Sequence, residues 1–152
     1  MSDSGFRLIG LNGLLIILLG MFAGGIPLTI LVTHDVYGQM AGVHVGGDYR
    51  AWMMAHLEGL LNGLLIIAIA AVTRVRPMAS GRERLLMPSL LVAAWGNAAA
   101  SVAAPVLGVR GMTFDAGLAN NLVALTFTVA LIASVIAMAI AIVHLAGRDS
   151  AR

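Results

Sequence analysis

Four apolar stretches dominate this chain, and each is long enough to cross the hydrocarbon core of a membrane as a helix. A transmembrane helix needs roughly 20 apolar residues, and the stretches cover about 8–33, 50–72, 85–107 and 118–145. Only 11% of the 152 residues are charged, against about a quarter in a soluble domain. The sequence therefore predicts an all-α fold, in which residues 1–152 form a single integral membrane domain built as a four-transmembrane-helix bundle. We expect the first stretch to be retained, because it is longer than the apolar core of a signal peptide.

The basic residues are all arginines, and they concentrate on one side of the predicted membrane. Two of the nine, Arg50 and Arg110, fall on the side opposite the termini, and the other seven fall on the side of the termini and the central loop. By the positive-inside rule both termini are predicted to be cytoplasmic, in a multi-pass protein of a bacterial inner membrane. We interpret the arginines as a topology signal that contacts lipid headgroups, and we expect no nucleic-acid binding because no extended basic face is present.

The chain contains no cysteine, which limits the cofactors that it could bind. Iron-sulfur clusters, thiolate zinc sites and covalently attached haem are excluded, so a cofactor must be held by His, Met, Tyr or carboxylate groups. The connection over about residues 34–49 is long, glycine-rich and contains His34 and His44, and loops of this kind are often functional. His144, at the cytoplasmic end of the last stretch, is expected to be exposed.

His56 lies nearly two turns inside the second stretch, and an ionisable residue at such a depth indicates a functional site. One interpretation is a neutral histidine that donates a hydrogen bond to a neighbouring helix, and the other is a metal or haem ligand. At 100° per residue, Gly59, Leu60 and Gly63 share its face. This low, flat surface would suit a porphyrin plane.

The heptapeptide LNGLLII occurs twice, at residues 11–17 and 61–67, and places an asparagine in each predicted helix. We interpret Asn12 as a packing residue that bonds a neighbouring helix, and Asn62 as a residue beside a site. Glu58 lies one turn before Asn62 on a shared face. We therefore predict a hydrogen bond between the Glu58 carboxyl group and the Asn62 amide.

Several short motifs with specific spacing resemble the styrene oxide isomerase family. The resemblance runs from the first stretch to the start of the fourth, and the spacing between His44, His56 and Asn62 is its most specific part. Its motifs are His44-Val45-x-Gly47, Trp52, Ala55-His56, Leu61-Asn62-Gly63, Ile67-Ala68-x-Ala70, Trp95-x-Asn97 and Arg110-Gly111-x-Thr113-Phe114.

The resemblance implies a small membrane enzyme that forms trimers and binds haem b near the protomer interface. His56 would be the axial ligand of the iron, Asn62 would lie on the substrate side, and Trp52, Gly59 and Gly63 would contact the cofactor. The iron would stay ferric and act as a Lewis acid on a hydrophobic epoxide, and a 1,2-shift would give a carbonyl compound. A dry apolar pocket and an open coordination position suffice for this chemistry.

The chain departs from the family pattern where family members carry a tyrosine after the Trp-x-Asn motif. Ser101 occupies this place and is the expected substitute, although its side chain is shorter than a phenol; Glu58 also replaces a small uncharged residue. Two alternatives stay open: a membrane haem protein for gas binding or electron transfer, and a haem-free structural or transport bundle.

Overall fold

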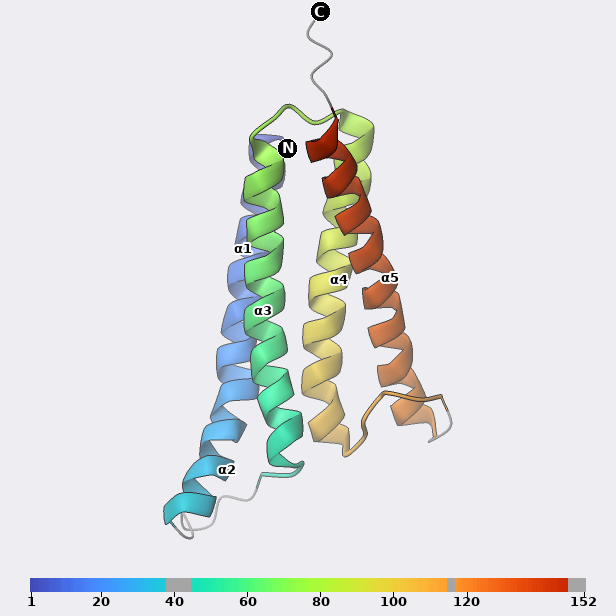
Figure 1. Ribbon diagram of the computed structural model, residues 1–152. Coiled ribbons are helices and arrows are strands. Elements are labelled where there is room, and N and C mark those ends of the chain that lie inside the picture. Colours follow the sequence, from blue (N-terminus) through green and yellow to red (C-terminus); the bar gives the residue numbers. More distant parts are fainter. Residues whose placement is uncertain (38–44, 115–116, 148–152) are drawn as a thin grey trace, which may run out of the picture.

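The computed structural model describes residues 1–37, 45–114 and 117–147, which form four long helical segments (Figure 1). The elements are α1 (Asp3–Leu19), a π-helical turn (Gly20–Gly24), α2 (Gly25–Tyr37), α3 (Tyr49–Arg74), α4 (Ser80–Leu107) and α5 (Leu118–Ala146). The first three run on as one segment. All four segments are long and apolar enough to cross a membrane, so the prediction of an all-α fold with four such helices is confirmed.

Three helix boundaries differ from the prediction, and the first is the start of α1, at Asp3 rather than near residue 8. The connection predicted to begin near residue 34 begins later, because α2 continues to Tyr37 and residues 34–37 include neither glycine nor proline. α4 starts at Ser80 rather than near residue 85, since hydropathy marks only the apolar part of a helix that continues into polar residues. His44 and the side chain of His34 lie outside the described residues.

The helices pack as two neighbouring pairs. α1 lies against α3, α4 lies against α5, and α3 and α4 join the pairs (Figure 1). α3 and α5 touch only slightly, and α5 leans away from the rest at the end where it begins. The α4–α5 connection crosses the space that this inclination opens.

Glycines let the backbones of α1 and α3 approach each other closely. A Cβ atom on Gly59 would lie 2.3 Å from the Cα of Gly20, and one on Gly63 would lie 2.5 Å from the carbonyl oxygen of Gly13. Small residues at helix interfaces permit this kind of contact in membranes, where dispersion rather than water exclusion drives packing. The surface of Gly59 and Gly63 is therefore occupied by α1 within one protomer, and is not open beneath the imidazole of His56 as the sequence suggested.

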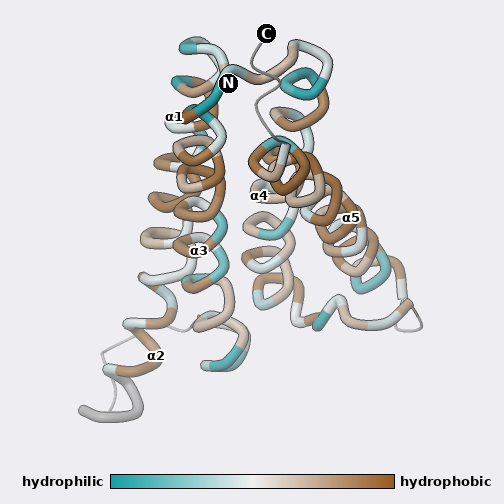
Figure 2. Tube along the Cα trace, turned by 45° about the horizontal axis from the view of Figure 1, so that its top comes forward, coloured by the Kyte–Doolittle hydropathy of each residue, from teal (hydrophilic) through white to brown (hydrophobic). Residues whose placement is uncertain are grey.

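The helices expose many large apolar side chains, and apart from Glu58 the charged residues of the described chain lie near the helix ends or in the connections (Figure 2). At the end where the chain starts, Arg74 forms an ion pair with Asp3 and stacks over the ring of Phe6, 4.7 Å from its centroid. Arg76 donates hydrogen bonds to the carbonyl oxygens of Leu145 and Gly147, where α5 ends. These contacts connect α1, α3 and α5 at that end.

Replacing Gly59 with Ala is expected to lower the stability of the helix assembly by about 1–3 kcal/mol, because the new methyl group meets the backbone of α1. The matched control is Gly10→Ala, where a Cβ atom meets nothing within 4 Å. This control should be neutral or stabilising by up to about 1 kcal/mol, since alanine favours helix more than glycine does. Thermal unfolding in detergent, followed by circular dichroism, measures both changes. Equal melting temperatures would contradict the close contact.

Candidate functional site

His56 is held between α3 and the π-helical turn of the first segment. Its Nδ1 atom lies 3.0 Å from the carbonyl oxygen of Gly20. A Cβ atom on Gly24 would lie 2.5 Å from the backbone nitrogen of His56, so a glycine is needed for the first segment to come this close. The turn thus fixes the position of the imidazole against the helix.

The π-helical turn is what places the Gly20 carbonyl at this spot. The backbone N–H of Gly25 donates to the carbonyl of Gly20, five residues earlier, which widens the turn by one residue. Such π-bulges occur often at functional sites because they redirect backbone groups that a regular helix would use internally.

The contact with Gly20 determines the tautomer of His56. A carbonyl oxygen can only accept a hydrogen bond, so Nδ1 carries the proton and Nε2 of the neutral ring keeps its lone pair. This is the arrangement found around metal-binding histidines, whose second nitrogen donates to a carbonyl or carboxylate. The two sequence interpretations of His56 are therefore compatible, since one nitrogen bonds the neighbouring helix and the other is left for a ligand.

Asn62 joins two helices through its amide group. Its Nδ2 atom donates to the backbone oxygen of Glu58 at 2.8 Å and to the Oε2 atom of that residue at 2.6 Å. Its Oδ1 atom accepts a hydrogen bond from Nδ2 of Asn97, on α4, at 3.2 Å. The predicted hydrogen bond between Glu58 and Asn62 is confirmed, and Asn97 extends it across the α3–α4 interface.

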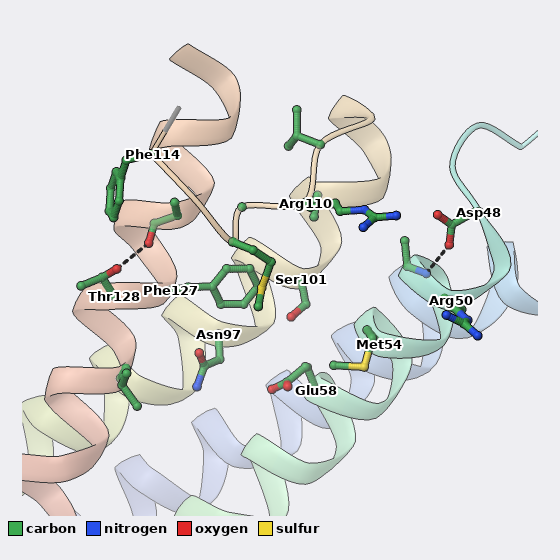
Figure 3. A pocket seen from close by; sticks show the side chains of 17 residues that line it. Asp48, Arg50, Met54, Glu58, Asn97, Ser101, Arg110, Phe114, Phe127 and Thr128 are labelled. Atoms are coloured by element: carbon green, nitrogen blue, oxygen red, sulfur yellow. Dashed lines mark hydrogen bonds between the residues drawn. The ribbon is translucent and has the colours of Figure 1, made fainter. Parts of the chain in front are cut away.

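A cavity of about 660 Å³ opens between α3, α4 and α5, at the end where α5 leans away. Most of its wall is apolar, from residues such as Met54, Phe127 and Leu131. Glu58, Asn97 and Ser101 provide polar groups in its interior, from two facing helices (Figure 3). Its remaining lining residues are Asp48, Arg50, Ala51, Ala104, Val109, Arg110, Gly111, Met112, Phe114, Ala124 and Thr128.

The structure brings some of the predicted site residues together and separates others. Ser101 and Glu58 line the cavity, whereas Asn62 is buried behind Glu58 and Asn97. His56 is not among the lining residues, because it faces the π-helical turn and the start of α2 on the other side of α3.

Trp52 anchors the segment that enters α3. Its indole Nε1 donates to the carbonyl oxygen of Gly46 at 2.7 Å, and its side chain is buried. Within the protomer Trp52 therefore contacts another part of the same chain, as Gly59 and Gly63 do. Contacts between these three residues and a haem stay predictions.

Two polar residues near the helix interfaces are structural. The Oδ1 atom of Asn12 accepts a hydrogen bond from the Trp95 indole at 2.9 Å, which confirms Asn12 as a packing residue between helices. The expectation that His144 is exposed was wrong: 4% of its surface is accessible, and its Nε2 lies 3.2 Å from the carbonyl oxygen of Thr73. α5 turns His144 toward α3 at the end of the bundle, which hydropathy alone does not reveal.

Sequence reasoning missed the way in which the α4–α5 connection closes one side of the cavity. Asn120 of α5 accepts a hydrogen bond from the Gly111 backbone at 2.8 Å and donates to the carbonyl oxygen of Thr113 at 2.5 Å. Gly111 has a φ of +64°, which favours glycine. The Arg110-Gly111-x-Thr113-Phe114 motif marked this segment, but only the fold shows that a buried amide holds it.

Across the three described stretches of chain, no three His, Cys, Asp or Glu side chains come close enough together to hold a metal ion. A haem needs a single protein ligand, and the Nε2 atom of His56, which has no hydrogen-bond partner among the described residues, fits that requirement.

These features define a small α-helical protein with four helices that could span a membrane, a partly buried histidine with one free nitrogen, and an apolar cavity with a polar interior. A sequence model of the styrene oxide isomerase family matches residues 6–146. The chain belongs to this family, and the resemblance seen in its motifs is confirmed. A comparison with curated proteins found no match to the chain. Family membership implies epoxide isomerase activity.

We predict that Asn120→Ala will loosen the connection over residues 109–114, because two backbone groups lose their partner. The expected loss of stability is about 1–3 kcal/mol, and amide hydrogen exchange at Gly111 should become faster. The matched control is the adjacent Asn121→Ala, since the buried Oδ1 of Asn121 has no hydrogen-bond partner among the described residues. If both variants exchange at Gly111 like the unmodified protein, Asn120 does not hold this segment.

Proposed function

We propose that the protein is a membrane haem b isomerase that converts a hydrophobic epoxide to a carbonyl compound. The observation that carries the proposal is the state of His56, whose Nδ1 donates to Gly20 and whose Nε2 is left with a lone pair. Family membership supports the reaction class. The isomerisation needs no co-reactant, since the product contains the same atoms as the epoxide.

In this proposal His56 is the axial ligand, and Trp52, Gly59 and Gly63 lie near the cofactor. Ferric haem, when bound, supplies a Lewis acid for the epoxide oxygen. The protein holds an apolar substrate away from water with side chains such as Met54 and Phe127. Ser101 offers a hydroxyl group within the same cavity, and Asn62 orients the polar side chains beside it.

In this proposal the protein forms a trimer, and the separation of His56 from the cavity supports an assembly of several copies. His56 faces the α1–α2 side of α3, whereas Glu58 and Ser101 face the cavity on the other side. A group bound to His56 of one protomer would meet a cavity only if a neighbouring copy supplied it.

We also propose that the chain is a single integral membrane domain of a bacterial inner membrane, with its termini on the cytoplasmic side. The support is the arginine distribution: Arg74 and Arg76 lie at the end where the chain starts, while Arg50 and Arg110 lie at the cavity end.

The optical spectrum of the purified protein tests the proposal. We expect a Soret band that shifts when an aryl epoxide is added, and a carbonyl product of the same mass as the epoxide. His56→Ala should abolish haem retention while the bundle still assembles, and added imidazole should restore part of the band. His144→Ala is the control, because this histidine bonds Thr73 and should leave haem content unchanged. Full haem content in His56→Ala would disprove the ligand assignment.

We expect Asn62→Ala to retain haem and to lower kcat by about tenfold or more, because Glu58 and Asn97 lose the amide that orients them. Asn12→Ala is a control in the same heptapeptide. It removes the bond to Trp95 and the bond from its own amide to the Leu8 carbonyl in the same helix, so it should cost on the order of 0.6 kcal/mol of stability between helices and leave kcat unchanged. Steady-state kinetics with haem content measured in parallel distinguishes the two, and similar kcat values for both variants would reduce Asn62 to a packing residue.

A further inference from the structure

Glu58 has one carboxyl oxygen engaged by the protein and one that is not. Oε2 accepts the hydrogen bond from Asn62 at 2.6 Å. Oε1 makes no hydrogen bond to any residue in the part of the chain that the structure describes, and the carboxyl group points into the cavity (Figure 3). A single oxygen would suffice to hold Asn62, so the second oxygen is available to a ligand.

The hydrogen bonds around Asn62 determine where its amide nitrogen and its amide oxygen point. The Nδ2 atom of Asn62 lies against two acceptors, both on Glu58, and its Oδ1 atom accepts from Asn97. Asn62 thus turns its N–H groups toward Glu58 and away from the cavity. The group that α3 presents to a ligand at this place is the Oε1 atom of Glu58.

An epoxide oxygen is itself only an acceptor, so it cannot hydrogen-bond to a carboxylate oxygen. The partner of Oε1 must be a donor on another part of the ligand. Arg50 and Arg110 lie at the open end of the cavity with Asp48, which leaves an excess of positive charge there (Figure 3). Asp48 already accepts a hydrogen bond from the backbone of Ala51. With the Glu58 carboxylate counted, the cavity wall carries two positive and two negative side chains, so a neutral donor leaves these charges balanced, whereas a cationic amine would not.

We propose that Glu58, acting as a carboxylate, accepts a hydrogen bond from a hydroxyl group of the ligand, so that the substrate is an apolar epoxide that also carries a hydroxyl group. The substrate class rests on the proposed isomerase function. The acceptor site itself does not, because it is formed by α3 and α4 of one protomer. Glu58 is then a specificity-determining residue.

Three probes that differ in one group test the acceptor: 4-ethylbenzyl alcohol, its methyl ether, and 4-ethyltoluene. The alcohol can donate, the ether can only accept, and the hydrocarbon can do neither. The full-length protein as purified, in lipid nanodiscs, should bind the alcohol about tenfold or more tightly than the ether, since hydrogen bonds to a charged group contribute about 1.5–3 kcal/mol. Equal binding of alcohol and ether would overturn the proposal.

Two substitutions should both remove the preference for the alcohol, but in different ways. Glu58→Gln should turn its oxygen to the Asn62 N–H and its NH₂ group to the cavity, so the ether gains affinity and the preference for the alcohol disappears. Glu58→Leu should bind alcohol and ether alike. Thr128→Val is the control, because Thr128 lines the cavity but its hydroxyl already donates to the Ala124 carbonyl at 2.8 Å. An alcohol preference that survives in Glu58→Gln or Glu58→Leu would overturn the assignment.

Because the chain has few glutamates, the carboxyl group of Glu58 can be observed directly by NMR. The chain has two glutamates, Glu58 and Glu83, and Glu83 lies near the start of α4, where it accepts a hydrogen bond from the Ser2 backbone at 2.8 Å. With ¹³C-labelled glutamate carboxyl groups, the alcohol should shift the Glu58 resonance and the ether should not. The Glu83 resonance should stay unchanged with both. A shift of Glu83 alone, or of neither, would contradict binding at Glu58.

Turnover then tests the substrate class. The protein should isomerise 4-(hydroxymethyl)styrene oxide about tenfold more efficiently, in kcat/KM, than its methyl ether, and Glu58→Leu should remove that difference. Equal efficiency in the unmodified protein would overturn the substrate class. If no epoxide is isomerised at all, the isomerase function fails, but the binding preference and the carboxyl shift still decide the role of Glu58.

Discussion

The close contact between Gly20 and Gly59 is the constraint on which the site depends. It brings the backbone of the first segment against α3, and it does so at the place where the first segment widens into a π-helical turn. The same approach places Gly24 against the backbone of His56 and the Gly20 carbonyl beside its imidazole. A packing contact between small residues therefore determines which nitrogen of the histidine carries its proton.

Polar side chains within the four helices fall into two groups: some bond to other parts of the fold, and others line the cavity. Asn12 and Trp95 bond to each other, and His144 lies against Thr73, so these groups are used by the fold. In an apolar surrounding an unpaired polar group is costly, which explains such pairing. Around the cavity the pattern differs, because Asn62 is fully engaged while Glu58 keeps one oxygen that faces open space. The inclination of α5 creates that space, and Asn120 holds the connection that borders it.

Much of the fold and part of the site could be predicted from the residues. Hydropathy located the four helices, because burial in lipid requires long apolar runs, and helical spacing predicted the Glu58–Asn62 bond because the two residues are one turn apart. The failures involve contacts between helices. The exposure of His144 and the open face at Gly59 were wrong, since each depends on which neighbour lies opposite, and no single helix specifies its neighbour.

The sequence by itself determined the class of the protein, its family and the helix that carries His56, Glu58 and Asn62, because these follow from composition, spacing and motifs along the chain. The tertiary structure decided how these residues are used. It turned His56 toward Gly20 and Glu58 toward a cavity on the opposite side of the same helix. Residues two positions apart on a helix point in nearly opposite directions, so their separate roles depend on what packs against each side of α3.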